Sequence, residues 1–92
     1  MKQFKFPFSR FEIKDKSMLP AFRPGEKVLS YNWGTIQKGS VVVFRYEGEY
    51  LIKRVKELKN DSLVVWSDNK KLAKREYEIK KKDIVGRVFL KY

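Results

Sequence analysis

Cysteine and histidine are both missing from this sequence of 92 residues. Without cysteine the chain cannot form a disulfide, and nothing in it indicates an oxidising compartment. Without either residue it lacks the usual soft ligands for a metal, and it has no Ser–His–Asp or Cys–His catalytic unit. An acyl-transfer enzyme built from this sequence would have to take its base from lysine, aspartate, glutamate or tyrosine. We expect no cofactor and no metal.

Long apolar runs are also missing, since no stretch approaches the roughly 20 residues that a membrane-spanning helix needs. The first residues are basic and aromatic but lack the continuous apolar segment of a signal peptide. Phe4, Phe6 and Phe8 alternate with other residues there, so we expect residues 1–10 to form an N-terminal arm or an edge strand. We expect a cytoplasmic protein, with peripheral contact to a membrane surface left open.

What the chain has in excess is positive charge. Lysine and arginine number 22 against 11 acidic residues, which gives a formal net charge of +11. Such a surface attracts nucleic acid, anionic lipid or acidic protein. No stretch has the layout of a known nucleic-acid module, so we interpret the charge as solubilising and expect no specific nucleic-acid partner. The length predicts a single domain over residues 1–92, and leaves the oligomeric state open.

The dominant hydrophobic period is two, which predicts strands. Short apolar segments are separated by turn residues, as in a β-barrel or a strongly bent sheet. We predict an all-β domain of strongly bent antiparallel sheets forming a partly open barrel, with a bulge or a close backbone approach at Gly86. One helical turn is expected at residues 18–22, and the lysine-rich stretch 70–82 is expected to be exposed. The predicted strands cover residues 41–44, 50–55, 62–66 and 83–90, with shorter candidates at 11–13 and 27–29.

Several short motifs occur in a specific order along the chain, although each alone is weak. They are Ser17-Met18-Leu19-Pro20, Pro24-Gly25-Glu26-Lys27-Val28, the segment 38–44, Leu51-Ile52-Lys53-Arg54-Val55, Ser67-Asp68-Asn69 and the terminal segment 83–88. In this order they resemble the superfamily that joins type I signal peptidases with LexA-type repressor peptidases. The resemblance runs from about Lys14 to the end, and is nearest to small soluble members without transmembrane helices.

The resemblance implies Ser17 as nucleophile and Lys53 as general base. A serine hydroxyl needs a neighbouring base, and a serine on a tight turn can direct its backbone N–H at an oxyanion. Period two places Lys53 on one strand face with Leu51 and Val55, an apolar setting that lowers the pKa of a lysine. Taken alone, Ser17 would more simply be a helix N-cap, and Lys53 a side chain whose amine reaches solvent.

Two departures from the resembled families stand out. Asp15 occupies the position where signal peptidases carry an oxyanion-binding serine, and we expect its carboxylate to point elsewhere. The oxyanion hole is then expected from the backbone N–H groups of Ser17 and Lys16, with Met18 and Pro20 contacting substrate. The serine that orients the lysine in signal peptidases is not identifiable after Asp68-Asn69.

These patterns predict a serine endopeptidase with a Ser–Lys dyad, which cleaves a protein or peptide bound as an extended strand. Signal-peptidase-like processing or protein maturation is the expected role. Self-cleavage is disfavoured, because the sequence has no Ala-Gly or Cys-Gly bond ahead of Ser17. The alternative is a non-catalytic basic binding module that keeps the peptidase fold.

Overall fold

A computed structural model describes residues 8–32, 35–72 and 74–92. These residues form seven strands and one short 3-10 helix, η1 (Lys81–Asp83). Residues 1–7 of the predicted N-terminal arm lie outside the described residues, and Phe8 begins the first strand. The strands are β1 (Phe8–Glu12), β2 (Lys27–Tyr31), β3 (Val41–Tyr46), β4 (Glu49–Leu58), β5 (Ser62–Trp66), β6 (Glu76–Lys80) and β7 (Ile84–Lys91).

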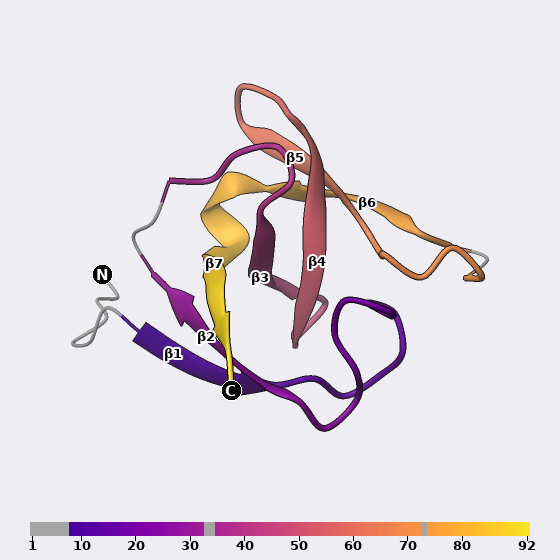
Figure 1. Cartoon of the computed structure of the whole chain (residues 1–92). Helices are drawn as coiled ribbons and strands as arrows, with labels where there is room; N and C mark the ends of the chain where they lie inside the picture. The colour runs from indigo at the N-terminus through magenta and orange to yellow at the C-terminus, as the bar shows by residue number, and fades with distance from the viewer. Residues whose placement is uncertain (1–7, 33–34, 73) are drawn as a thin grey trace.

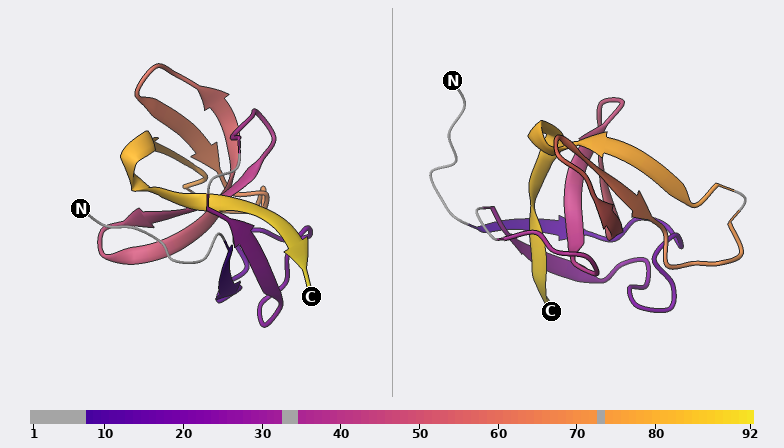
Figure 2. Two further views of the ribbon diagram at one scale, coloured as in Figure 1. Left: turned by 90° about the vertical axis from the view of Figure 1, so that its left-hand side faces the viewer. Right: turned by 90° about the horizontal axis from the view of Figure 1, so that it is seen from above.

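All seven strands belong to one antiparallel sheet in the order β1-β2-β7-β3-β4-β5-β6. The sheet bends strongly (Figures 1 and 2). Residues 84–87 of β7 pair with β3, whereas residues 87–91 pair with β2. Strands β1 and β6 are the two end strands and do not pair with each other, so the sheet of the described residues is not closed. The predicted all-β class and partly open architecture are confirmed.

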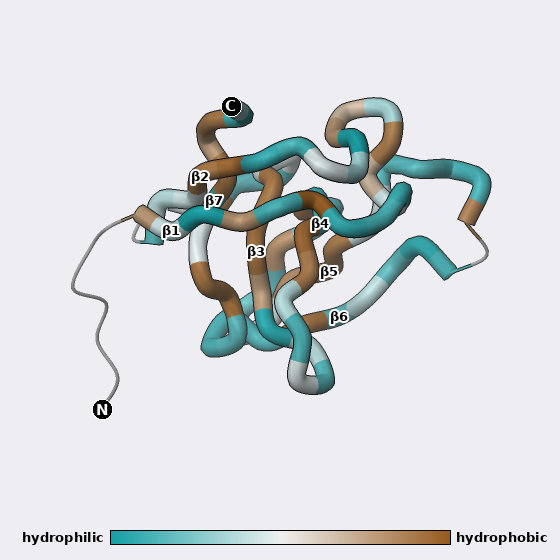
Figure 3. The backbone as a smooth tube through the Cα atoms, turned by 90° about the horizontal axis from the view of Figure 1, so that it is seen from below, coloured by the Kyte–Doolittle hydropathy of each residue, from teal (hydrophilic) through white to brown (hydrophobic). Residues whose placement is uncertain are grey.

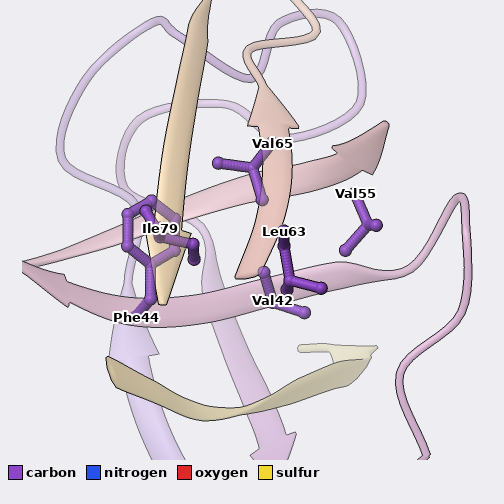
Figure 4. Packing of buried hydrophobic residues seen from close by; sticks show 6 residues of the cluster. All are labelled: Val42, Phe44, Val55, Leu63, Val65 and Ile79. Atoms are coloured by element: carbon purple, nitrogen blue, oxygen red, sulfur yellow. The ribbon is translucent and has the colours of Figure 1, made fainter. Parts of the chain in front are cut away.

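The core lies on the inner face of β3, β4, β5 and β6. Its buried cluster consists of Val42, Phe44, Val55, Leu63, Val65 and Ile79 (Figure 4). Burial alternates at every residue along β5, because successive side chains of a strand point to opposite faces, and the buried ones lie in this cluster. Apolar residues concentrate along the strands, whereas the segment joining β5 to β6 is largely hydrophilic (Figure 3).

Strand β6 lies inside the lysine-rich stretch, where the sequence analysis missed a strand. Tyr77 and Ile79 point inward, and Glu76, Glu78 and Lys80 are exposed. Charged residues suit the solvent-facing side of an edge strand. The alternation of a strand was therefore present in the sequence but was obscured by the many charged residues of this stretch. The lysines of this stretch are exposed, as expected.

Gly86 lies in β7, where a close backbone approach was predicted. A Cβ atom there would lie 2.8 Å from the backbone oxygen of Tyr31 and 3.1 Å from the Cα of Asn32. The β3–β7 register also shifts between Val43 and Phe44, next to this glycine. Both features of the prediction are confirmed, and they let β7 bend from one half of the sheet into the other.

Candidate active site

Ser17 lies in the loop that joins β1 to β2. The loop is closed at its base, where Ile13 N–H donates to the Glu26 oxygen and Gly25 N–H donates to the Ile13 oxygen, each at 2.8 Å. Beyond Ser17 the chain makes a single helical turn, with Phe22 N–H donating to the Met18 oxygen at 2.9 Å. The Met18 side chain is only 1% exposed and anchors the loop in the interior.

The Ser67-Asp68-Asn69 motif clamps this loop from the other side of the sequence. Asn69 donates its backbone N–H to the backbone carbonyl oxygen of Ser17, and its side-chain amide to the backbone carbonyl oxygen of Lys16, both at 2.9 Å. Asp68 N–H donates to the Met18 sulfur at 3.5 Å. The motif therefore fixes the backbone of Lys16 and Ser17 and the side chain of Met18, and with them the position of the Ser17 hydroxyl.

Lys53 comes from β4, whose lower end lies beside the Ser17 loop in Figure 1. It pairs with the buried Val42 of β3, and shares its buried face with Val55, as period two predicted. The Lys53 side chain is 4% exposed, and its Nζ lies 2.7 Å from the Ser17 Oγ. Ser17 is the single described residue that forms a hydrogen bond with this amine. Two residues 36 positions apart are thereby brought into direct contact.

The amine of Lys53 lies in an environment that favours its neutral form. Burial lowers the pKa of Lys53 from its ordinary value, and the negative charge of Asp15 opposes that effect only in part. The Tyr77 ring, 5.8 Å from Nζ, is a further weak attraction for the ammonium. With the proton on Lys53, the ammonium donates to the hydroxyl oxygen (Oγ) of Ser17. With the proton removed, the hydroxyl donates to the amine instead.

Asp15 contacts Ser17 directly, contrary to the expectation that it points elsewhere. Its Oδ1 accepts the backbone N–H of Ser17 at 3.0 Å. Burial raises the pKa of Asp15, but hydrogen bonds from the Ser17 N–H and hydroxyl, together with the charge of Lys53, outweigh it and lower that pKa overall. The expectation failed because it considered only repulsion of an oxyanion and not the N–H of Ser17 as a partner for the carboxylate. A carboxylate two residues ahead of a turn N–H is well placed to accept it.

Arg54 lies on the opposite face of β4 from Lys53 and supports the clamp. Its guanidinium binds both carboxylate oxygens of Asp68, at 2.9 and 2.8 Å, and donates to the Gly39 oxygen at 3.0 Å. A bidentate pair of this kind is geometrically specific. It joins β4, which carries the lysine, to the segment that holds the serine loop. Sequence reasoning named both residues within motifs but did not pair them.

A cleft of about 120 Å³ opens onto this site. Ser17, Lys53 and Asp15 line it, together with residues of the β1 end and of the first half of β4. Of the two residues predicted to contact substrate, Met18 forms part of the cleft wall, whereas Pro20 lines a separate cavity with Trp66 and Arg75.

The fold and the site together define a class of protein in which an open antiparallel β-sheet brings a serine and a buried lysine into contact. The sequence matches the Peptidase S24-like family over residues 9–89. The chain belongs to this family, which confirms the resemblance seen in the sequence and indicates a serine-peptidase-type fold. A comparison with curated proteins finds no match. In the part of the chain that the structure describes, no helix has the length and hydropathy that crossing a membrane requires.

Proposed function

We propose that this chain is a serine endopeptidase in which Ser17 is the nucleophile and Lys53 the general base. The observation that carries the proposal is the 2.7 Å contact between the buried Lys53 amine and the Ser17 hydroxyl. An amine that is desolvated and lies within hydrogen-bond distance of a hydroxyl can activate it. Membership of the Peptidase S24-like family supports the same assignment.

The reaction follows from this pair. Neutral Lys53 takes the proton of Ser17 while Oγ bonds to the carbonyl carbon of the substrate, and the carbonyl electrons move onto oxygen. When the tetrahedral intermediate collapses, the C–N bond breaks and the leaving nitrogen receives the proton from Lys53. Water then attacks the acyl-enzyme with Lys53 again as base, which releases the acid and restores the Ser17 hydroxyl.

The substrate would bind as an extended strand along the first half of β4. Pairing between β4 and β5 begins at Arg54 opposite Trp66, so β5 does not cover the residues of β4 that precede Arg54. These residues, including Lys53, line the cleft together with the end of β1. A peptide strand placed there would gain main-chain hydrogen bonds from the uncovered edge and present its carbonyl to Ser17.

The non-catalytic alternative has one observation in its favour. The Ser17 N–H, which an oxyanion would need, donates to the Asp15 carboxylate. A binding module that no longer cleaves peptides could tolerate this arrangement, and its exposed lysines would supply the contacts to an acidic partner.

Peptide cleavage by matched variants separates the two functions. The protein is incubated with a mixed peptide library, and new termini are read by mass spectrometry. We expect Ser17→Ala and Lys53→Met each to abolish cleavage, and the double variant to be no worse than either, because residues that act as one unit are not additive. Ser62→Ala and Lys56→Met are the controls, since both residues lie away from the cleft. Cleavage that survives in Lys53→Met would rule out the proposed base.

A further inference from the structure

The position of Asp15 creates a conflict with the reaction proposed above. Acyl transfer requires hydrogen-bond donors where negative charge develops on the carbonyl oxygen. The N–H of the nucleophilic residue is one of the donors expected here, and it is engaged by the Asp15 Oδ1 at 3.0 Å. The carboxylate therefore occupies the position from which an oxyanion would receive this hydrogen bond, and its own charge would repel the oxyanion.

Asp15 also acts on the base. It lies near enough to Lys53 for each charge to stabilise the other. The charge of Asp15 offsets part of the lowering that burial causes in the pKa of Lys53, so more of Lys53 stays in the ammonium form, which cannot accept the Ser17 proton. The same carboxylate thus engages the N–H of the nucleophile and holds back deprotonation of the base.

We propose that Asp15 is a positioning residue that holds Ser17 and Lys53 in a resting arrangement, and that a peptide strand entering the cleft displaces its carboxylate from the Ser17 N–H. The displacement of the carboxylate by a peptide rests on the proposed peptidase function. The control of Ser17 and Lys53 by Asp15 concerns the protein without substrate.

Other charged groups face the same cleft and set the field that Asp15 experiences. Glu12 from the end of β1 and Glu49 from the start of β4 line it, as does Lys14 of the serine loop. Glu12 is already paired with Lys14 at 3.8 Å. Lys53 is the buried basic residue among these groups, so removing Asp15 would further weaken the stabilisation of its charged form.

Two substitutions separate the charge of Asp15 from its hydrogen bond. Asp15→Asn keeps an oxygen that can accept the Ser17 N–H but loses the charge, and Asp15→Ala loses both. We expect Asp15→Ala to raise kcat/KM at neutral pH by about tenfold, since one oxyanion donor is worth roughly 10²–10³ in kcat and displacement of the carboxylate consumes part of it. Both variants should shift the acidic limb of the pH–activity profile to lower pH, and Asp15→Asn should gain less in rate.

The matched controls are Asp61→Asn and Asp61→Ala, at an exposed turn away from the cleft. They change the net charge equally and should leave both the rate and the pH profile unchanged. A shifted profile identifies an effect on Lys53, which a merely structural role of Asp15 would not produce. Lower activity in both Asp15 variants, with an unchanged profile and native stability, would overturn the proposal.

A second measurement does not depend on cleavage. In NMR titrations of the wild type, the amide proton of Ser17 should shift as Asp15 titrates, and the Lys53 side-chain signals should titrate at lower pH in both Asp15 variants. If the chemical shift of the Ser17 amide proton does not change as Asp15 titrates, the resting arrangement is overturned, whatever the activity. If the NMR responses appear but no variant cleaves any peptide, the control by Asp15 stands and the peptidase function fails.

Discussion

Replacing Lys53 by methionine tests whether the amine is neutral or charged in the folded protein. Methionine keeps the length of the side chain and its contacts with the interior, but removes the amine that lies 2.7 Å from the Ser17 hydroxyl. The lost hydrogen bond costs about 0.5–1.5 kcal/mol. Against this, the variant no longer buries a group whose charged form is destabilised, which is worth about 1.4 kcal/mol for each unit by which the pKa is lowered.

The sign of the net effect depends on pH. The pKa of Lys53 is lowered in the folded state from an ordinary value of 10.5, through burial. Below the folded pKa both states carry the proton, so the wild type bears the whole penalty. Between the folded pKa and 10.5 the unfolded state binds more protons, and wild-type stability rises with pH. Lys53→Met should therefore be more stable than wild type at acidic pH, at least as stable near neutrality, and less stable above the ordinary pKa.

Thermal unfolding followed by circular dichroism at acidic, neutral and alkaline pH measures this crossover. A change of 1 kcal/mol corresponds to about 4–8 °C in Tm for a domain of this size. The control is Lys56→Met, because Lys56 lies on the same strand but is paired with Glu76 in an exposed position. An inactive Lys53→Met that is destabilised at all three pH values would show that Lys53 is charged and paired in the native state. The chain would then lack a base, and the peptidase proposal would fail.

Three further outcomes are expected from the fold and the surface. Gly86→Ala should lose about 1–3 kcal/mol of stability, because its Cβ would lie 2.8 Å from the Tyr31 oxygen; unchanged denaturant unfolding would refute that close approach. Phe44→Ala should lose about 3–5 kcal/mol, since Phe44 is fully buried in the core; a loss under 1 kcal/mol, on the same assay, would mean that this core is loosely packed. Nucleic acid should bind the lysine-rich stretch 70–82 weakly, with affinity that falls steeply with salt and shows no sequence preference in anisotropy titrations. Tight binding to one sequence at physiological salt would instead favour the binding module.

Local pattern was enough to predict most of the sheet. Strands can be predicted from the alternation of apolar and polar residues and from the turn residues between them, because both are properties of neighbouring positions. The strands around residues 41–44 and 62–66 followed from this directly. Strand β6 escaped because the outward positions beside Tyr77 and Ile79 are charged, and an edge strand tolerates such residues. Its inward positions become recognisable once β5 supplies the surface they cover.

The contact between Ser17 and Lys53 was also predicted from the sequence. Alternation placed Lys53 on the buried face of its strand, and the ordered motifs related it to Ser17 despite the 36 positions between them. What sequence could not supply was distance. The 2.7 Å contact exists because the loop after β1 is fastened by Asn69 and by the buried Met18, and these are long-range contacts.

The surroundings of Asp15 combine a local contact, its hydrogen bond to the N–H of Ser17 two residues later, with a long-range one, the charge of Lys53 from β4. In sequence it appears as an acidic residue where an oxyanion donor is expected, which suggested that it would turn away. In the fold, the N–H of a tight turn and a buried lysine both attract its carboxylate. Sequence could determine which residue types are available for chemistry, because that depends on local pattern. The protonation and hydrogen-bond partners of those residues depend on which charges the folded chain brings within a few ångströms of one another.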